Sequence, residues 1–135
     1  MTRIIRSSQL TTCDTVDGGA AIRLDFKDES GQPVSVTLPF EQAQSVVMTL
    51  PNLLSDALRK QTQNDKARFV FNLGHWTLEG ASKARAILTL RTEDGFEVSF
   101  AVPIEACPSI GRALNQEGAT VSTSAHETRR PAGLH

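Results

Sequence analysis

Residues 33–41 read PVSVTLPFE and residues 97–105 read EVSFAVPIE, so the chain repeats one pattern 64 positions later. Aligning residues 21–50 with residues 85–114 needs no gap and gives nine identities in thirty positions. Unrelated segments of ordinary composition match at about two such positions. The identities continue past the shared proline to Leu50 and Leu114, which is farther than two similar β-hairpins would explain. The sequence therefore predicts two similar halves.

Each half contains two runs in which apolar and polar residues alternate, which predicts a pair of half-buried strands. The turns between the runs, DESGQ and TEDG, contain Gly31 and Gly95, which can adopt positive φ angles. An N-terminal strand is also predicted in each half, because TRIIRSS at 2–8 resembles ARFVFNL at 67–73. In the first half the alternating apolar residues are Ile22, Leu24, Phe26, Val34, Val36 and Leu38.

A helix is predicted directly after Pro39 and after Pro103, because proline cannot donate to a strand ladder and helical apolar spacing begins at the next residue. Pro51 lies inside the first helical pattern and predicts a kink or a restart near Leu50. The second helix is predicted to be shorter and weaker, since Gly111 lies within it.

These patterns predict an α+β fold of two tandem β-β-β-α repeats, spanning about 2–62 and 67–117. We expect them to form one pseudo-two-fold domain over 1–118, with about six antiparallel strands and two helices on one face. An intertwined arrangement, in which each half supplies strands to the other, is the alternative. Residues 119–135 are predicted to be a disordered polar tail, because they lack apolar periodicity.

The composition is that of an ordinary globular protein, with 39% apolar residues, 21% charged residues and a net charge of −1. It gives no sign of strong electrostatic attraction to nucleic acid or to a membrane surface. The start resembles no signal peptide, and no apolar run is long enough to span a bilayer. We therefore expect a cytoplasmic protein whose Cys13 and Cys107 are free thiols. No cofactor or metal is predicted.

No catalytic motif is present, so the sequence predicts a protein that is not an enzyme. Among the histidines, only His75 lies in a region expected to be folded, beside the single tryptophan, Trp76. These two residues are weak candidates for a ligand site at a loop tip. The simpler interpretation is a partly buried pair at the end of a strand. Glu41 and Glu105 are expected to begin the helices, where the helix dipole favours negative charge.

An apolar patch is predicted on the open face of the second half, where Val70, Ile87 and Ala101 are candidate interface residues. The sequence therefore favours a non-catalytic binding or interaction protein that forms a homodimer through its second half. Another protein or a small apolar ligand are the other expected partners. Packing of Ile87 and Val70 beneath the tail or a loop is the alternative explanation.

Over residues 2–117, the order of the predicted elements, strands followed by one helix and repeated after about 64 residues, resembles the topology of PUR repeats. That resemblance implies single-stranded nucleic-acid binding on the open sheet face as the alternative function. The stretch ILTLRTEDGFEVSFAVP also resembles small bacterial proteins, which implies a cytoplasmic location. The residues that would contact phosphates are Arg6, Arg23, Lys27, Arg68, Arg85 and Arg91.

Overall fold

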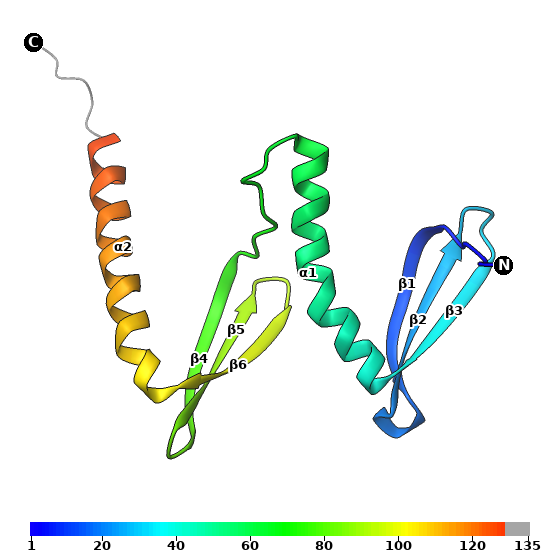
Figure 1. Cartoon of the computed structure of the whole chain (residues 1–135), viewed down its shortest axis with the longest axis horizontal. Helices are drawn as coiled ribbons and strands as arrows, with labels where there is room; N and C mark the ends of the chain where they lie inside the picture. The colour runs from blue at the N-terminus through cyan, green and yellow to red at the C-terminus, as the bar shows by residue number, and fades with distance from the viewer. Residues whose placement is uncertain (129–135) are drawn as a thin grey trace, which may run out of the picture. The chain divides into compact units, whose positions relative to one another are not determined.

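The computed structural model describes the backbone of residues 1–128 and the side chains of residues 1–121. The chain divides into two compact units, the first spanning Met1–Val70 and the second beginning at Phe71. Each unit is a three-stranded antiparallel sheet followed by one long helix (Figure 1). The predicted α+β layout of tandem β-β-β-α repeats is therefore confirmed. How the two units combine into one domain stays a prediction.

The first unit contains a sheet in the strand order β1-β2-β3, which we call sheet A. The antiparallel register pairs Ile22 with Leu38 and Leu24 with Val36, so the alternating apolar residues share one face as the sequence predicted. The elements are β1 (Ser7–Val16), the 3-10 turn η1 (Asp17–Gly19), β2 (Ala21–Asp28), β3 (Pro33–Pro39) and α1 (Phe40–Thr62).

The second unit repeats this order in sheet B, which is arranged β4-β5-β6. Gly95 in its β5–β6 turn adopts a φ of 96°, and Gly31 in the corresponding turn of sheet A adopts 83°. Both glycines therefore take the positive φ angles that the turns were predicted to need. The elements are β4 (Leu73–Ser82), β5 (Arg85–Thr92), β6 (Glu97–Pro103), the 3-10 turn η2 (Ile104–Ala106) and α2 (Cys107–Thr128).

The N-terminal strand of each unit lies later in the chain than predicted. Strand β1 begins at Ser7 and strand β4 at Leu73, whereas the sequence placed these strands at 2–8 and 67–73. Val70 therefore precedes β4 and does not lie in a strand. The apolar runs around residues 4 and 70 misled the assignment, because the strands that form contain few consecutive apolar residues.

Two expectations about the helices were wrong: a restart at Pro51, and a tail without regular structure over residues 119–128. A kink near Leu50, the other possibility at Pro51, stays a prediction. Helix α1 continues through Pro51 without a restart, since a single proline removes only one backbone hydrogen bond from a helix that extends on both sides. Helix α2 has 22 residues and reaches Thr128, so residues 119–128 of the predicted tail are helical. Serine and threonine lower helix propensity only modestly, and an established helix propagates through them. The rest of the predicted tail, 129–135, lies outside the described residues.

The junctions between sheet and helix in the two units share one hydrogen bond, although η2 separates β6 from α2. No loop separates β3 from α1, and the Phe40 N–H donates to the Ala20 carbonyl at 2.9 Å. At the equivalent place, the Ile104 N–H donates to the Ala84 carbonyl at 3.1 Å. The first residue of α1 and the first residue of η2 are thereby each fixed to the turn between the first two strands of their unit. Figure 1 shows each helix leading away from the end of its own sheet.

Candidate functional site: the uncovered apolar faces

One face of sheet A is formed by apolar and small side chains from all three strands. Leu10 and Cys13 of β1 lie opposite Phe26 and Leu24 of β2, and β2 in turn pairs with the apolar residues of β3. We call this surface face A. It consists of Leu10, Cys13, Ile22, Leu24, Phe26, Val34, Val36 and Leu38.

Sheet B has an equivalent surface, which we call face B, and it is more strongly apolar. Trp76 and Leu78 of β4 lie opposite Leu90 and Leu88, at the places that Leu10 and Cys13 occupy in sheet A. A tryptophan and a leucine thus replace a leucine and a cysteine at one edge. Face B consists of Trp76, Leu78, Ala86, Leu88, Leu90, Val98, Phe100 and Val102.

Neither face is covered by the helix of its own unit. Trp76 is 60% exposed, Leu78 is 55% exposed and Phe100 is 51% exposed. Among residues 1–121, the only buried apolar residues are Ala21 and Ala86. Folded proteins ordinarily bury most of their large apolar side chains, so each unit presents an apolar surface that a monomeric protein rarely exposes to water.

Helix α1 presents a second uncovered apolar surface, the α1 stripe. Its members recur every three or four residues and therefore lie along one side of the helix. Leu53, at 54% exposed, is typical of them. The α1 stripe consists of Phe40, Val46, Val47, Leu50, Leu53 and Leu54. The corresponding α2 stripe is sparser and consists of Ile110, Leu114 and Val121, with Gly111 and Gly118 between them.

The opposite face of sheet A is polar and is linked across its three strands by Asp25. The Asp25 carboxylate accepts hydrogen bonds from Ser35 of β3 and from Thr12 of β1, the latter at 2.7 Å. The Arg23 guanidinium lies 3.4 Å away. The Ser35 hydroxyl, followed by the Thr12 hydroxyl and the Arg23 charge, lowers the pKa of Asp25 below its ordinary value.

We expect acid to weaken this network. A carboxylate whose pKa is lower in the folded state stabilises the fold above its unfolded pKa, about 3.9, and that stabilisation is lost as the pH falls through the folded pKa. Thermal melts should therefore show a lower melting temperature at pH 3 than at pH 7. Asp25→Asn should lower the melting temperature at pH 7 and reduce its dependence on pH below 4. Asp65→Asn, a change in the exposed segment after α1, should do neither.

The polar face of sheet B contains the predicted interface residues of that sheet. Ile87 and Ala101 lie directly opposite each other on β5 and β6, but polar groups flank them. Thr89 and Ser99 share a hydrogen bond of 2.8 Å, and the Arg91 guanidinium contacts the Glu97 carboxylate at 2.9 Å through two nitrogens. The predicted patch is thus two residues wide. Val70, which is 67% exposed, belongs to the first unit and precedes β4.

The two candidate ligand residues lie near the start of β4, in keeping with the strand-end interpretation. His75 lies opposite Arg91 and Trp76 opposite Leu90. Adjacent residues of a strand point to opposite faces, so His75 belongs to the polar face of sheet B and Trp76 to face B. The two side chains therefore do not form one site. Both are exposed.

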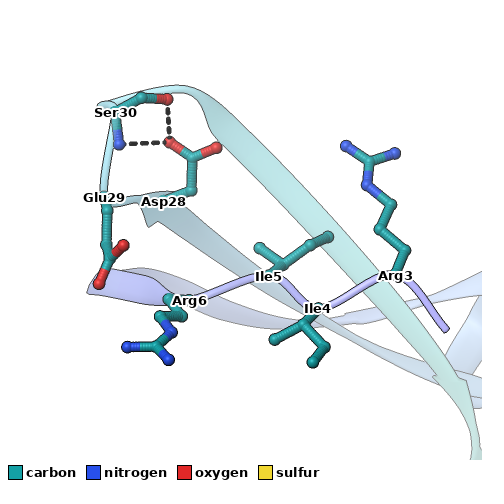
Figure 2. Close-up of a pocket in the computed structure, with 7 residues that line it drawn as sticks. All are labelled: Arg3, Ile4, Ile5, Arg6, Asp28, Glu29 and Ser30. Carbon is teal, nitrogen blue, oxygen red and sulfur yellow. Dashed lines mark hydrogen bonds between the residues drawn. The ribbon is translucent and has the colours of Figure 1, made fainter.

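An open hollow of about 520 Å³ lies between residues 3–6 and the β2–β3 turn. The Glu29 N–H donates to the Arg6 carbonyl at 3.1 Å and holds the two segments together. Figure 2 shows the Arg3 and Arg6 side chains pointing to opposite sides of the N-terminal segment, while the Asp28 carboxylate accepts hydrogen bonds from Ser30. The two guanidinium groups do not converge on one point, so this hollow does not form an anion site.

The described residues contain no group of three or more histidine, cysteine, aspartate or glutamate side chains that could hold a metal ion. No helix in the described part of the chain is long and apolar enough to span a membrane. Comparison with protein-family models, with curated proteins and with solved structures finds no match to this chain.

Sequence reasoning identified the residues that β2, β3, β5 and β6 contribute to the two apolar faces, and took these faces to be the buried side of the sheets. It missed the residues of β1 and β4, because it placed those strands earlier in the chain. The signal for the exposure of the faces was present in the sequence. Phe40 follows Pro39 directly and Ile104 follows Pro103 directly, and connections of two to six residues are typical where a helix packs back on its strands. The missing loop indicates that α1 cannot return to sheet A, whereas β6 and α2 are joined by the three residues of η2.

Proposed function

We propose that this protein is a non-catalytic protein-interaction module that self-associates as a homodimer. The observation that supports this proposal is the pair of uncovered apolar surfaces in each unit, a sheet face and a helix stripe. Burial of one Val, Leu or Phe side chain is worth about 1.5 to 3 kcal/mol, whereas ordering the backbone costs about 1 to 2 kcal/mol per residue. A chain with these surfaces in water lacks the burial that would offset that cost.

Nucleic-acid binding through the open sheet faces has weaker support. Arg23 and Arg91, which would contact phosphates there, each lie against a carboxylate on the same face. Base-stacking proteins place aromatic side chains beside such cations, but Trp76 lies on the apolar side of sheet B, opposite Leu90. The polar sheet faces therefore provide neither free arginines at these two positions nor the tryptophan as a stacking platform.

We also propose a cytoplasmic location. Cys13 and Cys107 are free thiols in the structure, and Cys13 is exposed. Free, exposed thiols are typical of proteins in reducing compartments.

The mass in solution tests self-association. Light scattering coupled to size-exclusion chromatography should give about 29 kDa, twice the chain mass of 14.6 kDa. Dilution should shift the peak toward 14.6 kDa. A mass of 14.6 kDa at every concentration up to about 100 μM, well above ordinary dimer dissociation constants, would contradict the proposal.

A further inference from the structure

We propose that two copies of the chain associate by exchanging helices, so that the helix stripes of each copy lie on faces A and B of the other. This inference rests on the proposed self-association and specifies its geometry. The occupant of each apolar sheet face is then a helix of a second copy, and the occupant of each helix stripe is a sheet face of that copy.

The junctions exclude the helix of the same unit as the cover. The Phe40 N–H is bonded to the Ala20 carbonyl, and the preceding residue, Pro39, has a φ of −53° and a ψ of 152°. In the second unit the Ile104 N–H makes the equivalent hydrogen bond after Pro103, but η2 separates this residue from the start of α2 at Cys107. For α1 to fold onto face A, this hydrogen bond would have to break and several helical residues would have to unwind into a loop. The hydrogen bond made by the residue after the proline is present in both units.

The surfaces match in number and in size. Each unit offers one sheet face and one helix stripe, so two identical chains present equal numbers of each, and a two-fold arrangement closes without leaving one unpaired. Three strands span about 10 Å between the outer two, and a helix is about 10 to 12 Å wide. Helix α1, with its 23 residues, is about 35 Å long and therefore covers the length of any of the strands.

The surfaces also match in chemistry. The residues that define faces A and B are all uncharged. Asp28 follows Phe26 in the same alternation at the end of β2, and its carboxylate accepts hydrogen bonds from the Ser30 and Gln32 N–H groups. On α1, Glu41 and Arg59 lie on the side of the helix away from the stripe, because both are about half a turn from Leu50 at 100° per residue. Docking of the α1 stripe would therefore bury no unpaired charge. The α2 stripe differs in this respect, because Glu117 lies three residues after Leu114 and four before Val121 and so shares the side of the helix that carries the stripe. The net charge of −1 gives little repulsion between two copies.

The available area is sufficient for a stable dimer. Faces and stripes together include fourteen large apolar side chains that are 38% to 70% exposed. At roughly 100 Å² for each, they present more than about 1,000 Å² per chain, compared with about 800 Å² per partner in an interface of standard size. They are Leu10, Val36, Phe40, Val46, Val47, Leu50, Leu53, Leu54, Trp76, Leu78, Phe100, Ile110, Leu114 and Val121.

The duplication provides matched positions for a complementation test. Leu24 and Leu88 are equivalent positions in the two sheet faces, and Leu50 and Leu114 are equivalent positions in the two stripes. A sheet variant carries Leu24→Asp with Leu88→Asp, and a helix variant carries Leu50→Asp with Leu114→Asp. Each variant alone should lose at least 100-fold in dimer affinity, because every helix–sheet contact would include a carboxylate.

Mixing the two variants should restore a dimer. In a mixed pair, the intact helices of the sheet variant meet the intact sheets of the helix variant, so half of the contacts are free of the introduced charges. We expect a species of twice the chain mass that contains one copy of each variant, detected by native mass spectrometry with one variant isotopically labelled. Recovery of the far-ultraviolet circular dichroism signal on mixing would give the same result for variants that are unfolded alone.

Two control pairs keep the test specific. Asn52→Asp with Gln116→Asp places the charges on the other side of each helix, and Thr37→Asp with Thr77→Asp places them on the polar sheet faces. Both controls should dimerise like the unmodified chain, within about threefold. Less drastic versions, with alanine in place of aspartate at the four leucines, should show the same pattern of loss and rescue.

Three outcomes would overturn the exchange. If the helix variant dimerised normally while the sheet variant did not, the sheets would associate face to face, and self-association would stand without helix exchange. If both variants were monomeric and their mixture formed no dimer, the helices and sheets would not be each other's partners. A monomeric unmodified chain would overturn both this inference and the proposed function.

Discussion

Trp76→Ala is expected to raise the dissociation constant of the dimer about 30- to 1,000-fold, equivalent to about 2 to 4 kcal/mol. Trp76 is 60% exposed in the single chain and lies in face B beside Leu78 and Leu90. Tryptophan is the residue type most often found to dominate interface energies, because its ring buries a large area with little loss of side-chain entropy. Analytical ultracentrifugation over a dilution series measures the change.

Two controls accompany this variant. Trp76→Phe retains an aromatic ring and should lose less than about tenfold in affinity. His75→Ala changes the adjacent residue, which lies opposite Arg91 on the polar face, and should leave the dissociation constant unchanged. If Trp76→Ala dimerised as tightly as the unmodified chain while His75→Ala did not, the polar face of sheet B would be the interface instead.

Pro51→Ala is expected to raise the free energy of unfolding by about 3 kcal/mol. Pro51 lies inside the continuous helix α1, where it cannot donate to the carbonyl of Val47 and its ring crowds the preceding turn. Alanine restores the donor and removes the clash. Urea denaturation followed by circular dichroism, at one fixed protein concentration, measures the difference.

Asn52→Ala is the control for Pro51→Ala. It changes the neighbouring residue of the same helix and should add no more than about 0.7 kcal/mol, the ordinary range of helix propensity. An unchanged or lower stability for Pro51→Ala would contradict the expectation. It would indicate that the shape which Pro51 gives to α1 stabilises the assembled protein by more than the missing hydrogen bond destabilises it.

Much of the fold could be predicted from the sequence, because its determinants are local. Strands β2, β3, β5 and β6 are marked by alternating apolar and polar residues and by the glycines in their turns. The same pattern occurs in both halves, which strengthens each assignment. Strand β1 was harder to recognise, since SSQLTTCDTV contains only three apolar or sulfur-bearing residues that could mark a face. The C-terminal part of α2 has no apolar periodicity either, so its helix follows from propagation and not from an amphipathic pattern.

The candidate site was predictable only in part. Alternation shows which residues share a face, and it correctly placed Leu24 with Val36 and Leu88 with Phe100. It does not show what covers that face, because coverage depends on the angle between sheet and helix. That angle is set by the hydrogen bond from the Phe40 N–H to the Ala20 carbonyl. The sequence therefore predicted an interface at Ile87 and Ala101, two apolar residues on the polar face of sheet B, because face B was expected to be buried in the core.

The labelling rate of Cys13 tests most directly whether a second copy covers the apolar faces. Cys13 is exposed in the single chain and lies in face A, opposite Leu24. A helix about 10 Å wide that docks on a three-stranded sheet would cover β1 together with its neighbours. In a Cys107→Ser variant, Cys13 is the only thiol. Excess maleimide should label it at least tenfold more slowly above the dissociation constant than below it. The same slow labelling rate at every dilution, or a fast labelling rate at high protein concentration, would contradict the coverage of face A by a second copy.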